Sequence, residues 1–279
     1  MIDPLVSVDW LFERLGDSTV QIIDASWWMP AENRSGQAEF PVRHIPGAMF
    51  FDIDAITDQS SDLPHMLPSP EAFAAAAGQL GLSRDATIIV YDTFGIRAAA
   101  RVWWTLRVMG FTHVFVLDGG LKAWEAKGQP TASGPALPNQ TQLPPVFRSD
   151  LVRTAADIIA ILNDQPQQMV DARSSARFRG EVPEPRPGLR GGHMPGARNV
   201  PFDSLLTSDG QMKSADDIIA VFQAAGVELG APIVTTCGSG VTASVLALAL
   251  AHIGYADVPV YDGSWSEWGA LPDAPIATG

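Results

Sequence analysis

Cysteine is almost absent from this chain: Cys237 is the only one among 279 residues. A single thiol excludes an intramolecular disulfide framework and a cysteine-rich zinc site. Long hydrophobic runs are absent as well, because the longest uncharged apolar stretch, residues 241–251, is too short to span a bilayer. The first residues contain neither a basic n-region nor a sustained apolar h-region. We therefore expect no secretory signal and predict a cytoplasmic location.

Positive charge is also scarce. The sequence has 18 Lys and Arg against 31 Asp and Glu, which gives a formal net charge of -13 and a sequence pI of about 4.6. A nucleic-acid phosphate backbone is therefore an unfavourable partner. No run of like charge suggests an adhesive tail, so we predict neither a nucleic-acid nor a membrane partner.

What the chain does contain is an internal repeat. HIPGAMF at 44–50 resembles HMPGARN at 193–199, VQIIDAS at 20–26 resembles QMVDARS at 168–174, and FVLDGGLKAW at 115–124 resembles PVYDGSWSEW at 259–268. The matched pairs lie 149, 147 and 144 positions apart and occur in the same order. This period suits two domains of ordinary size and is too long for a solenoid repeat. We infer a duplicated domain.

A stretch rich in proline and small polar residues, 131–146, separates the two copies. We place the first domain at 1–135, a linker at 136–149 and the second domain at 150–279. Within each copy, short apolar runs that end in a polar residue alternate with helix-like segments such as 69–81 and 214–226. This alternation predicts an α/β fold, with a parallel sheet covered by helices on both faces in each domain.

Cys237 lies where such folds place their reactive groups, beyond the carboxyl end of a strand. Residues 231–236 predict a buried strand and 241–252 a helix, so CGSG must join them. Gly238 and Gly240 permit a tight turn whose backbone N–H groups converge, and the following helix N-terminus adds positive potential. Both features favour a thiolate over a thiol. In the first repeat Asp92 falls opposite Cys237, so we predict that only the second domain is catalytic.

Several cysteine chemistries fit this loop less well. A phosphatase loop needs an arginine six positions after the cysteine, where this chain has Ala243. Thioredoxin-like exchange normally uses a second nearby cysteine, and a Cys-His-Asn acyl-transfer site lacks any supporting sequence around Cys237. His44 and His193, in the two HxPGA motifs, are expected to be architectural turn residues. RVWW and WSEWG are expected to pack in the core.

Over nearly its whole length the sequence resembles the tandem-domain rhodanese family of sulfurtransferases. The resemblance rests on HIPGAMFFDID, PHMLP, RVWW, LDGGLKAW, RFRGEVPEPRPG, GGHMPGA, CGSGVTA and YDGSWSEWG. CGSGVTA is similar to the loop of members that use 3-mercaptopyruvate as sulfur donor. Thiosulfate-preferring members carry two cations where this chain has Gly238 and Ser239. The resemblance implies two rhodanese-like domains and no metal or organic cofactor.

The resemblance also implies residue roles. Cys237 would attack the substrate sulfur, become a persulfide and release pyruvate, and a thiol acceptor such as thioredoxin would remove the outer sulfur. Arg177 and Arg186 would bind the substrate carboxylate and keto oxygen, with Arg179 close enough to be mistaken for either. The expected catalytic residues are Cys237, Ser239, His65 and Asp54, with the last three forming a proton relay. The expected substrate-binding residues are Arg177, Arg186, Gly238, Gly240, Val241 and Thr242.

Two rival functions stay open from the sequence. One is a thiosulfate:cyanide sulfurtransferase, which differs only in its preferred donor. The other is a non-catalytic carrier that holds a persulfide without multiple turnover.

Overall fold

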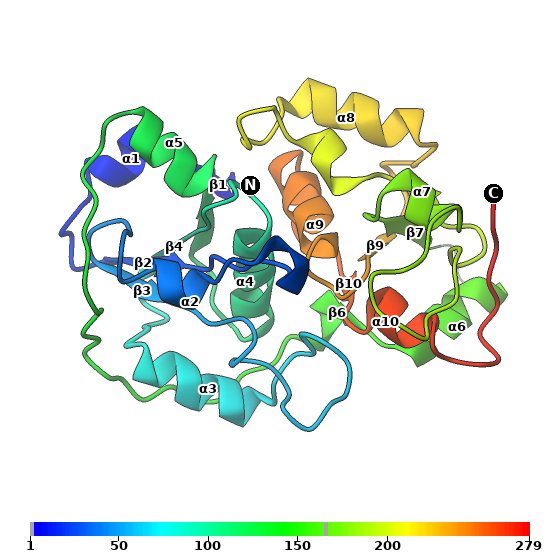
Figure 1. The fold of residues 1–279 in the computed structure, drawn as a ribbon, viewed down its shortest axis with the longest axis horizontal. Coiled ribbons are helices and arrows are strands. Elements are labelled where there is room, and N and C mark those ends of the chain that lie inside the picture. The colour runs from blue at the N-terminus through cyan, green and yellow to red at the C-terminus, as the bar shows by residue number, and fades with distance from the viewer. Residues whose placement is uncertain (1–2, 165–166) are drawn as a thin grey trace.

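Two parallel β-sheets form the framework of the protein (Figure 1). The computed structural model describes residues 3–164 and 167–279. The first half of the chain forms a five-stranded sheet in the order β1-β5-β4-β2-β3, and the second half forms one in the order β6-β10-β9-β7-β8. The two orders correspond strand by strand, as expected for a duplicated domain. The strands are β1 Leu5–Val6, β2 Val20–Asp24, β3 Ala48–Phe50, β4 Thr87–Tyr91, β5 Val114–Leu117, β6 Val152–Arg153, β7 Gln168–Asp171, β8 Arg198–Asn199, β9 Ile233–Thr236 and β10 Val260–Tyr261.

Helices cover both faces of each sheet. In the first domain α1, α2 and α5 pack on one face and α3 and α4 on the other; in the second, α6, α7 and α10 cover one face and α8 and α9 the other. The predicted α/β fold class is therefore confirmed. The α-helices are α1 Val8–Phe12, α2 Gly36–Glu39, α3 Pro70–Gln79, α4 Ala98–Val108, α5 Gly120–Ala126, α6 Ala155–Asp164, α7 Ser175–Phe178, α8 Ala215–Ala224, α9 Ala243–His252 and α10 Ser264–Trp268. Short 3₁₀ helices are η1 Pro30–Glu32, η2 Ser149–Leu151 and η3 Phe202–Leu205.

The predicted helix signals at 69–81 and 214–226 correspond to α3 and α8. The hydroxyl of Ser69 accepts a hydrogen bond from the N–H of Ala72, and that of Ser214 accepts one from Asp217, so each serine caps its helix. Gly81 follows the first helix with a φ of +73°, a conformation that glycine adopts without strain. Among the described residues, no helix is long and apolar enough to cross a membrane.

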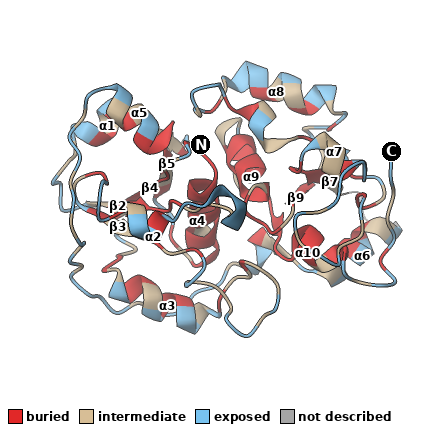
Figure 2. Ribbon diagram, in the orientation of Figure 1, coloured by how far each residue is buried: buried red, intermediate tan, exposed pale blue. Residues whose placement is uncertain are grey.

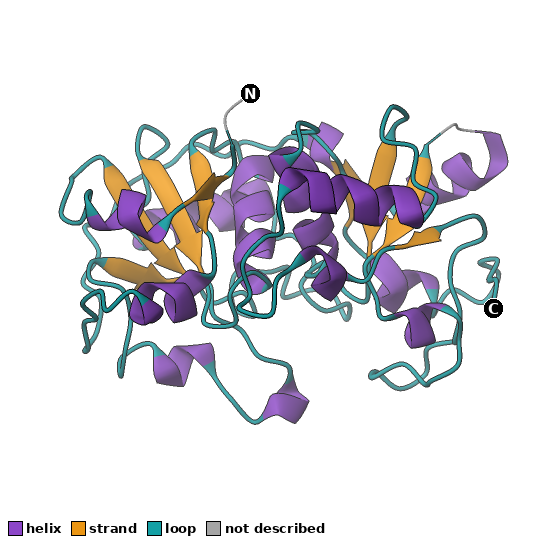
Figure 3. Cartoon of the chain, turned by 90° about the horizontal axis from the view of Figure 1, so that it is seen from above, coloured by secondary structure: helices purple, strands orange, loops and turns teal. Residues whose placement is uncertain are grey.

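The two domains share a hydrophobic core. Helices α4 and α9 lie side by side in the centre of the molecule, between the sheets (Figures 1 and 3). One continuous cluster of buried apolar side chains includes both helices and the inner faces of both sheets. Every residue of α9 from Ala243 to Ala251 is buried, which is expected of a helix that is apolar all round (Figure 2). The loop that leads into α9, residues 237–242, therefore lies next to the first domain.

The segment between the domains is fastened to the first domain. The N–H of Gly134 donates to the carbonyl of Pro41, that of Thr141 to Gly78, and that of Arg148 to Val108, at 2.7–2.9 Å. Its proline-rich composition predicts a separating linker, but its backbone groups find partners along the surface that it crosses. The exact domain limits at 135 and 150 stay a prediction.

The two HxPGA histidines are structural in the same way in both copies. His44 is buried, its Nδ1 lies 2.7 Å from the carbonyl of Phe40, and its ring stacks on that phenylalanine. His193 repeats this arrangement with Phe178, at 2.8 Å. Neither residue lines a site, as the sequence predicts for turn residues.

A buried aspartate ends the interior strand β2, and no described residue gives it a cationic partner. Asp24 is 2% exposed and accepts a hydrogen bond from the N–H of Ser26. Its counterpart Asp171, at the end of β7, pairs instead with Arg173 at 2.7 Å. Burial raises the pKa of Asp24 from its usual 3.8 to about 6, although hydrogen bonds from Ser26 act in the opposite direction.

Replacing Asp24 by asparagine should therefore change how stability depends on pH. A carboxyl with a raised pKa in the folded state costs stability once it ionises, so the wild type loses stability as the pH rises from about 4 to about 6. The Asp24→Asn variant lacks this loss. Its free energy of unfolding relative to wild type should rise by about 2 kcal/mol between pH 4 and pH 7, measured by urea titration. Parallel pH profiles for the two proteins would contradict this assignment.

Candidate active site

Cys237 follows β9 directly and opens the loop 237–242 that leads into α9. The residue is 2% exposed. Its N–H donates to the hydroxyl of Ser264 at 3.2 Å, and its carbonyl accepts from the N–H of Trp265 at 2.9 Å. The next carbonyl, that of Gly238, accepts from both the N–H and the hydroxyl of Ser266. The start of α10 thus fixes the backbone on which the thiol stands.

The rest of this loop presents unused hydrogen-bond donors. Within residues 3–164 and 167–279, no acceptor is bonded to the backbone N–H groups of 238–242. Successive free amides before a helix N-terminus form a site for an anion, such as a thiolate, a persulfide or an incoming carboxylate. Gly240 has a φ of +77°, and a Cβ there would lie 2.5 Å from Nη1 of Arg101, so the tight loop requires glycine.

The first domain builds the same loop and fills it. Asp92 follows β4, which holds the place in its sheet that β9 holds in the other. The Asp92 carboxylate accepts hydrogen bonds from the N–H groups of Gly95 at 2.9 Å, Arg97 at 2.9 Å and Ala99 at 2.8 Å. We call these loop N–H groups the amide cradle of each domain: those of Gly95, Arg97 and Ala99 in the first domain and those of 238–242 in the second. A side-chain carboxylate occupies the first cradle, whereas the second has no acceptor among the described residues and lies beside a thiol.

Cys237 opens onto a cavity of about 190 Å³ between the domains. Of the residues predicted from the sequence, seven line it: Cys237, Gly238, Ser239, Val241, Thr242, Arg177 and Arg186. Gly240, His65 and Asp54 are not among its lining residues. Sequence reasoning missed the remaining lining residues, which are Trp27, Met29, Arg97, Ala172, Arg173, Ser174, Pro185 and Phe202. Trp27, Met29 and Arg97 belong to the first domain, so both domains build the cavity.

The two predicted arginines differ in whether a carboxylate of the described residues pairs with them. Arg177 pairs with the buried carboxylate of Glu184, and its Nη2 lies 3.0 Å from where a Cβ on Gly238 would stand. Arg186 makes no hydrogen bond or ion pair with any described residue. Burial lowers the pKa of Arg186, and the nearby Cys237 sulfur offsets part of that effect. A partly buried guanidinium without a partner is suited to bind a carboxylate in bidentate fashion.

Glu184 is a further residue that the sequence did not single out. Its side chain is 2% exposed, and it bonds both Arg177 and the fully buried Arg173, the latter at 2.9 Å. The third arginine of this segment, Arg179, is exposed and pairs with Glu181 at 2.6 Å, away from the cavity. The ambiguity among the three arginines is thereby resolved in favour of Arg177 and Arg186 as cavity residues.

His65 connects the two domains at the cysteine loop. Its Nδ1 lies 3.2 Å from Oγ of Ser239, and its Nε2 lies 3.1 Å from Oδ1 of Asp54. The predicted Asp54–His65–Ser239 contacts are therefore all present. Trp27 adds a contact that the sequence did not predict, since its indole N–H donates to Oδ2 of Asp54 at 2.9 Å. The hydrogen bonds from His65 and then Trp27 lower the pKa of Asp54, against the effect of burial.

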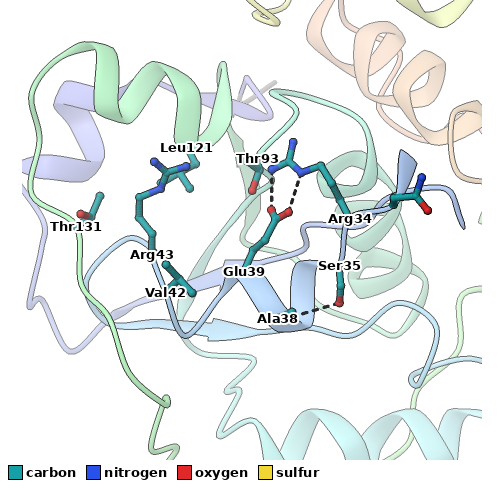
Figure 4. Close-up of a pocket in the computed structure, with 10 residues that line it drawn as sticks. Arg34, Ser35, Ala38, Glu39, Val42, Arg43, Thr93, Leu121 and Thr131 are labelled. Carbon is teal, nitrogen blue, oxygen red and sulfur yellow. Dashed lines mark hydrogen bonds and ion pairs between the residues drawn. The ribbon is translucent and has the colours of Figure 1, made fainter. Parts of the chain in front are cut away.

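A larger hollow, of about 860 Å³, lies on the first domain. Its charged groups are already matched: Arg34 forms a bidentate pair with Glu39 at 2.7 Å (Figure 4), and Arg43 pairs with Glu125 at 3.0 Å. It contains no cysteine or histidine. We therefore place the site at the smaller cavity, which combines a nucleophile with amides and an arginine that have no partner in the part of the chain that the structure describes. Among the described residues, no group of three or more His, Cys, Asp or Glu could hold a metal ion.

Fold and cavity together define a class: a duplicated α/β protein with one cysteine in an anion-binding loop between its domains. Comparison with known protein families agrees: the family described as Rhodanese-like domain matches this chain twice, at residues 7–127 and 154–271. The chain belongs to the rhodanese family, as the sequence motifs predict.

Individual relatives match along almost the whole chain. The 3-mercaptopyruvate sulfurtransferase of Escherichia coli K12 is 44% identical, over 97% of this chain and 96% of that protein. A protein of Arabidopsis thaliana named thiosulfate/3-mercaptopyruvate sulfurtransferase 1, mitochondrial, is 44% identical over 98% of this chain and 78% of its own length. The crystal structure of SseA from Escherichia coli, a 3-mercaptopyruvate sulfurtransferase, superposes with a TM-score of 0.87 over 95% of this chain and 99% of that one, at 42% identity.

The filled cradle of the first domain makes a testable prediction. Replacing Asp92 by alanine leaves three buried amide N–H groups without an acceptor, so the free energy of unfolding should fall by about 3 kcal/mol. Asp85→Ala is the control, because that carboxylate is exposed and makes no hydrogen bond with another described residue; its effect should stay within about 0.5 kcal/mol. Equal stabilities of the two variants in urea titration would show that Asp92 does not fill the cradle.

Proposed function

We propose that the protein is a 3-mercaptopyruvate sulfurtransferase that forms a persulfide on Cys237 and passes its outer sulfur to a thiol acceptor. One observation carries the proposal. The only cysteine stands in a cradle of free amide N–H groups, in the same cavity as a guanidinium, that of Arg186, which has no partner among the described residues. A small α-keto acid that carries a carboxylate and a sulfur matches both features. The family and the names of the near-full-length relatives support the same activity.

In the first half-reaction the Cys237 thiolate attacks the substrate sulfur. A bond forms between the two sulfur atoms and the carbon–sulfur bond of 3-mercaptopyruvate breaks, so its electron pair becomes the enolate of pyruvate. The proton carried by the incoming sulfur is transferred to that enolate, which leaves an anionic persulfide and pyruvate. Ser239 and His65 are placed to move this proton, with Asp54 orienting the imidazole.

The amide cradle and the arginines stabilise the negative charges of the reaction. The backbone N–H groups of Gly238, Ser239, Gly240, Val241 and Thr242 stabilise first the thiolate and then the persulfide. Arg186 and Arg177 bind the substrate carboxylate and keto oxygen, and they stabilise the negative charge that develops on that oxygen. In the second half-reaction an acceptor thiolate attacks the outer sulfur and restores the Cys237 thiolate. Thioredoxin is the acceptor that we propose.

Thiosulfate is the second candidate donor. Gly238 and Ser239 bring no cation to the loop, which favours the monoanionic 3-mercaptopyruvate over a dianion. Arg97 and Arg186 nevertheless line the cavity, and the Arabidopsis relative is named for both donors. A ratio of kcat/KM that favours thiosulfate would contradict the assignment of the donor. The predicted cytoplasmic location stays a prediction, since that relative's name places it in mitochondria.

Neutralising Arg186 should weaken turnover selectively. Arg186→Gln removes the one cavity arginine without a carboxylate partner among the described residues, so kcat/KM for 3-mercaptopyruvate should fall about 10- to 100-fold, the range for losing hydrogen bonds to a charged group. The reaction is followed as pyruvate released in the presence of a reduced thiol. Arg179→Gln is the matched control, because Arg179 is a neighbouring arginine outside the cavity. Equal rates for the two variants would overturn the role of Arg186.

A further inference from the structure

His65 has a backbone conformation that few residues other than glycine adopt. Its φ is +60°, in the left-handed region. Such a conformation is strained and persists only where surrounding contacts enforce it. The contacts that enforce it at His65 come from a buried ion pair, Arg101 and Asp262, with one member on each domain.

The ion pair holds the backbone from the carbonyl of His65 to the amide of Leu67. Arg101, on α4, donates from Nη2 to the carbonyl of His65. The same nitrogen lies 2.7 Å from Oδ1 of Asp262, which follows β10 in the second domain. Oδ2 of Asp262 accepts the N–H of Leu67 at 2.8 Å. The carbonyl of His65 and the amide two residues later are thus bonded to the two halves of one pair.

Arg101 also contacts the cysteine loop. It is 2% exposed, and its Nη1 lies 2.5 Å from where a Cβ on Gly240 would stand. That nitrogen has no hydrogen-bond partner among the described residues. The Arg101 side chain therefore contacts both the segment that carries His65 and the loop that carries Ser239. The side chains of His65 and Ser239 are themselves 3.2 Å apart.

We propose that Arg101 and Asp262 are a positioning pair that holds His65 against Ser239, so that proton transfer depends on contact between the domains. The proposal rests on the function proposed above, because it assigns the pair a role in that turnover. Stability alone explains the pair poorly. A buried ion pair costs desolvation, and apolar residues of similar volume are often as stable or more so. The directed bonds to His65 and Leu67 are what apolar residues could not supply.

The central variant replaces both charges, as Arg101→Met with Asp262→Leu. Each single change leaves an unpaired buried charge and should destabilise the protein strongly, whereas the double change should be closer to wild type. Its kcat for 3-mercaptopyruvate should still fall about 10- to 100-fold with KM within about two-fold, since a displaced proton-transfer group affects turnover more than binding. Arg101→Lys, which keeps the charge, should retain intermediate activity and serves if the double variant does not fold.

A second interdomain pair provides the control. Arg107, also on α4, pairs with Asp257 of the second domain at 2.9 Å. Among the described residues, its hydrogen bonds go to Ala256 and Asp257 and not to the segment around His65. Arg107→Met with Asp257→Asn should leave kcat unchanged. A comparable loss of kcat in this control would mean that any interdomain ion pair matters, and it would overturn the specific role of Arg101 and Asp262.

A double-mutant cycle with His65→Asn tests whether the pair acts through His65. Asparagine tolerates the left-handed conformation but cannot replace the imidazole. If the pair only positions His65, the combined variant should be no slower than His65→Asn alone. Additive losses, or full activity of His65→Asn, would overturn the proposal about the pair. The proposed function would still stand in that case, provided that the wild type turns over 3-mercaptopyruvate. Absence of 3-mercaptopyruvate turnover in the wild type would instead overturn both.

Discussion

The structure depends on how two equivalent loops satisfy their backbone N–H groups. In each sheet the middle strand leads into a loop with several backbone N–H groups, and buried amides require an acceptor. In the first domain the carboxylate of Asp92 is that acceptor, and the loop is purely structural. In the second domain a thiol stands at the start of the loop, and the amides of 238–242 have no acceptor among the described residues and stay free for a sulfur anion. Asp92 and Cys237 thus hold equivalent positions in the two loops but differ in role.

The shared core between α4 and α9 brings the rest of the site to that loop. Because α9 begins where the cysteine loop ends, the packing that buries α9 also presses the loop against the first domain. The first domain then supplies groups that the second lacks, namely Trp27, His65 and Arg97. The cavity carries guanidinium groups although the whole chain has a net charge of -13, and within the described part of the chain only Arg186 among them lacks a carboxylate partner. Anion binding is thus a local property that overall charge does not predict.

The sequence predicted those features that are encoded locally. The strand runs, the helices at 69–81 and 214–226 and the strand–CGSG–helix signal all depend on neighbouring residues, and the repeat revealed the duplication. Family motifs indicated Arg177, Arg186, Asp54, His65 and Ser239. Trp27 and the Arg101–Asp262 pair were not predicted because their contacts join segments that are separated in the chain, which no periodicity records. Glu184 lies close in sequence to Arg173 and Arg177, but no motif indicated that its carboxylate would be buried between them. The contacts that the predicted linker 136–149 makes with the first domain could not be predicted for the same reason, since its hydrogen-bond partners lie on distant elements.

The most direct test of this account is the mass of the intact protein after brief exposure to 3-mercaptopyruvate, with pyruvate assayed in the same sample. The account predicts a gain of one sulfur atom, located on Cys237 by peptide mapping and matched by one equivalent of pyruvate. The added sulfur should be lost on addition of a reduced thiol, and Cys237→Ser should gain nothing. Pyruvate release without a persulfide on Cys237, or a persulfide formed from thiosulfate alone, would contradict it.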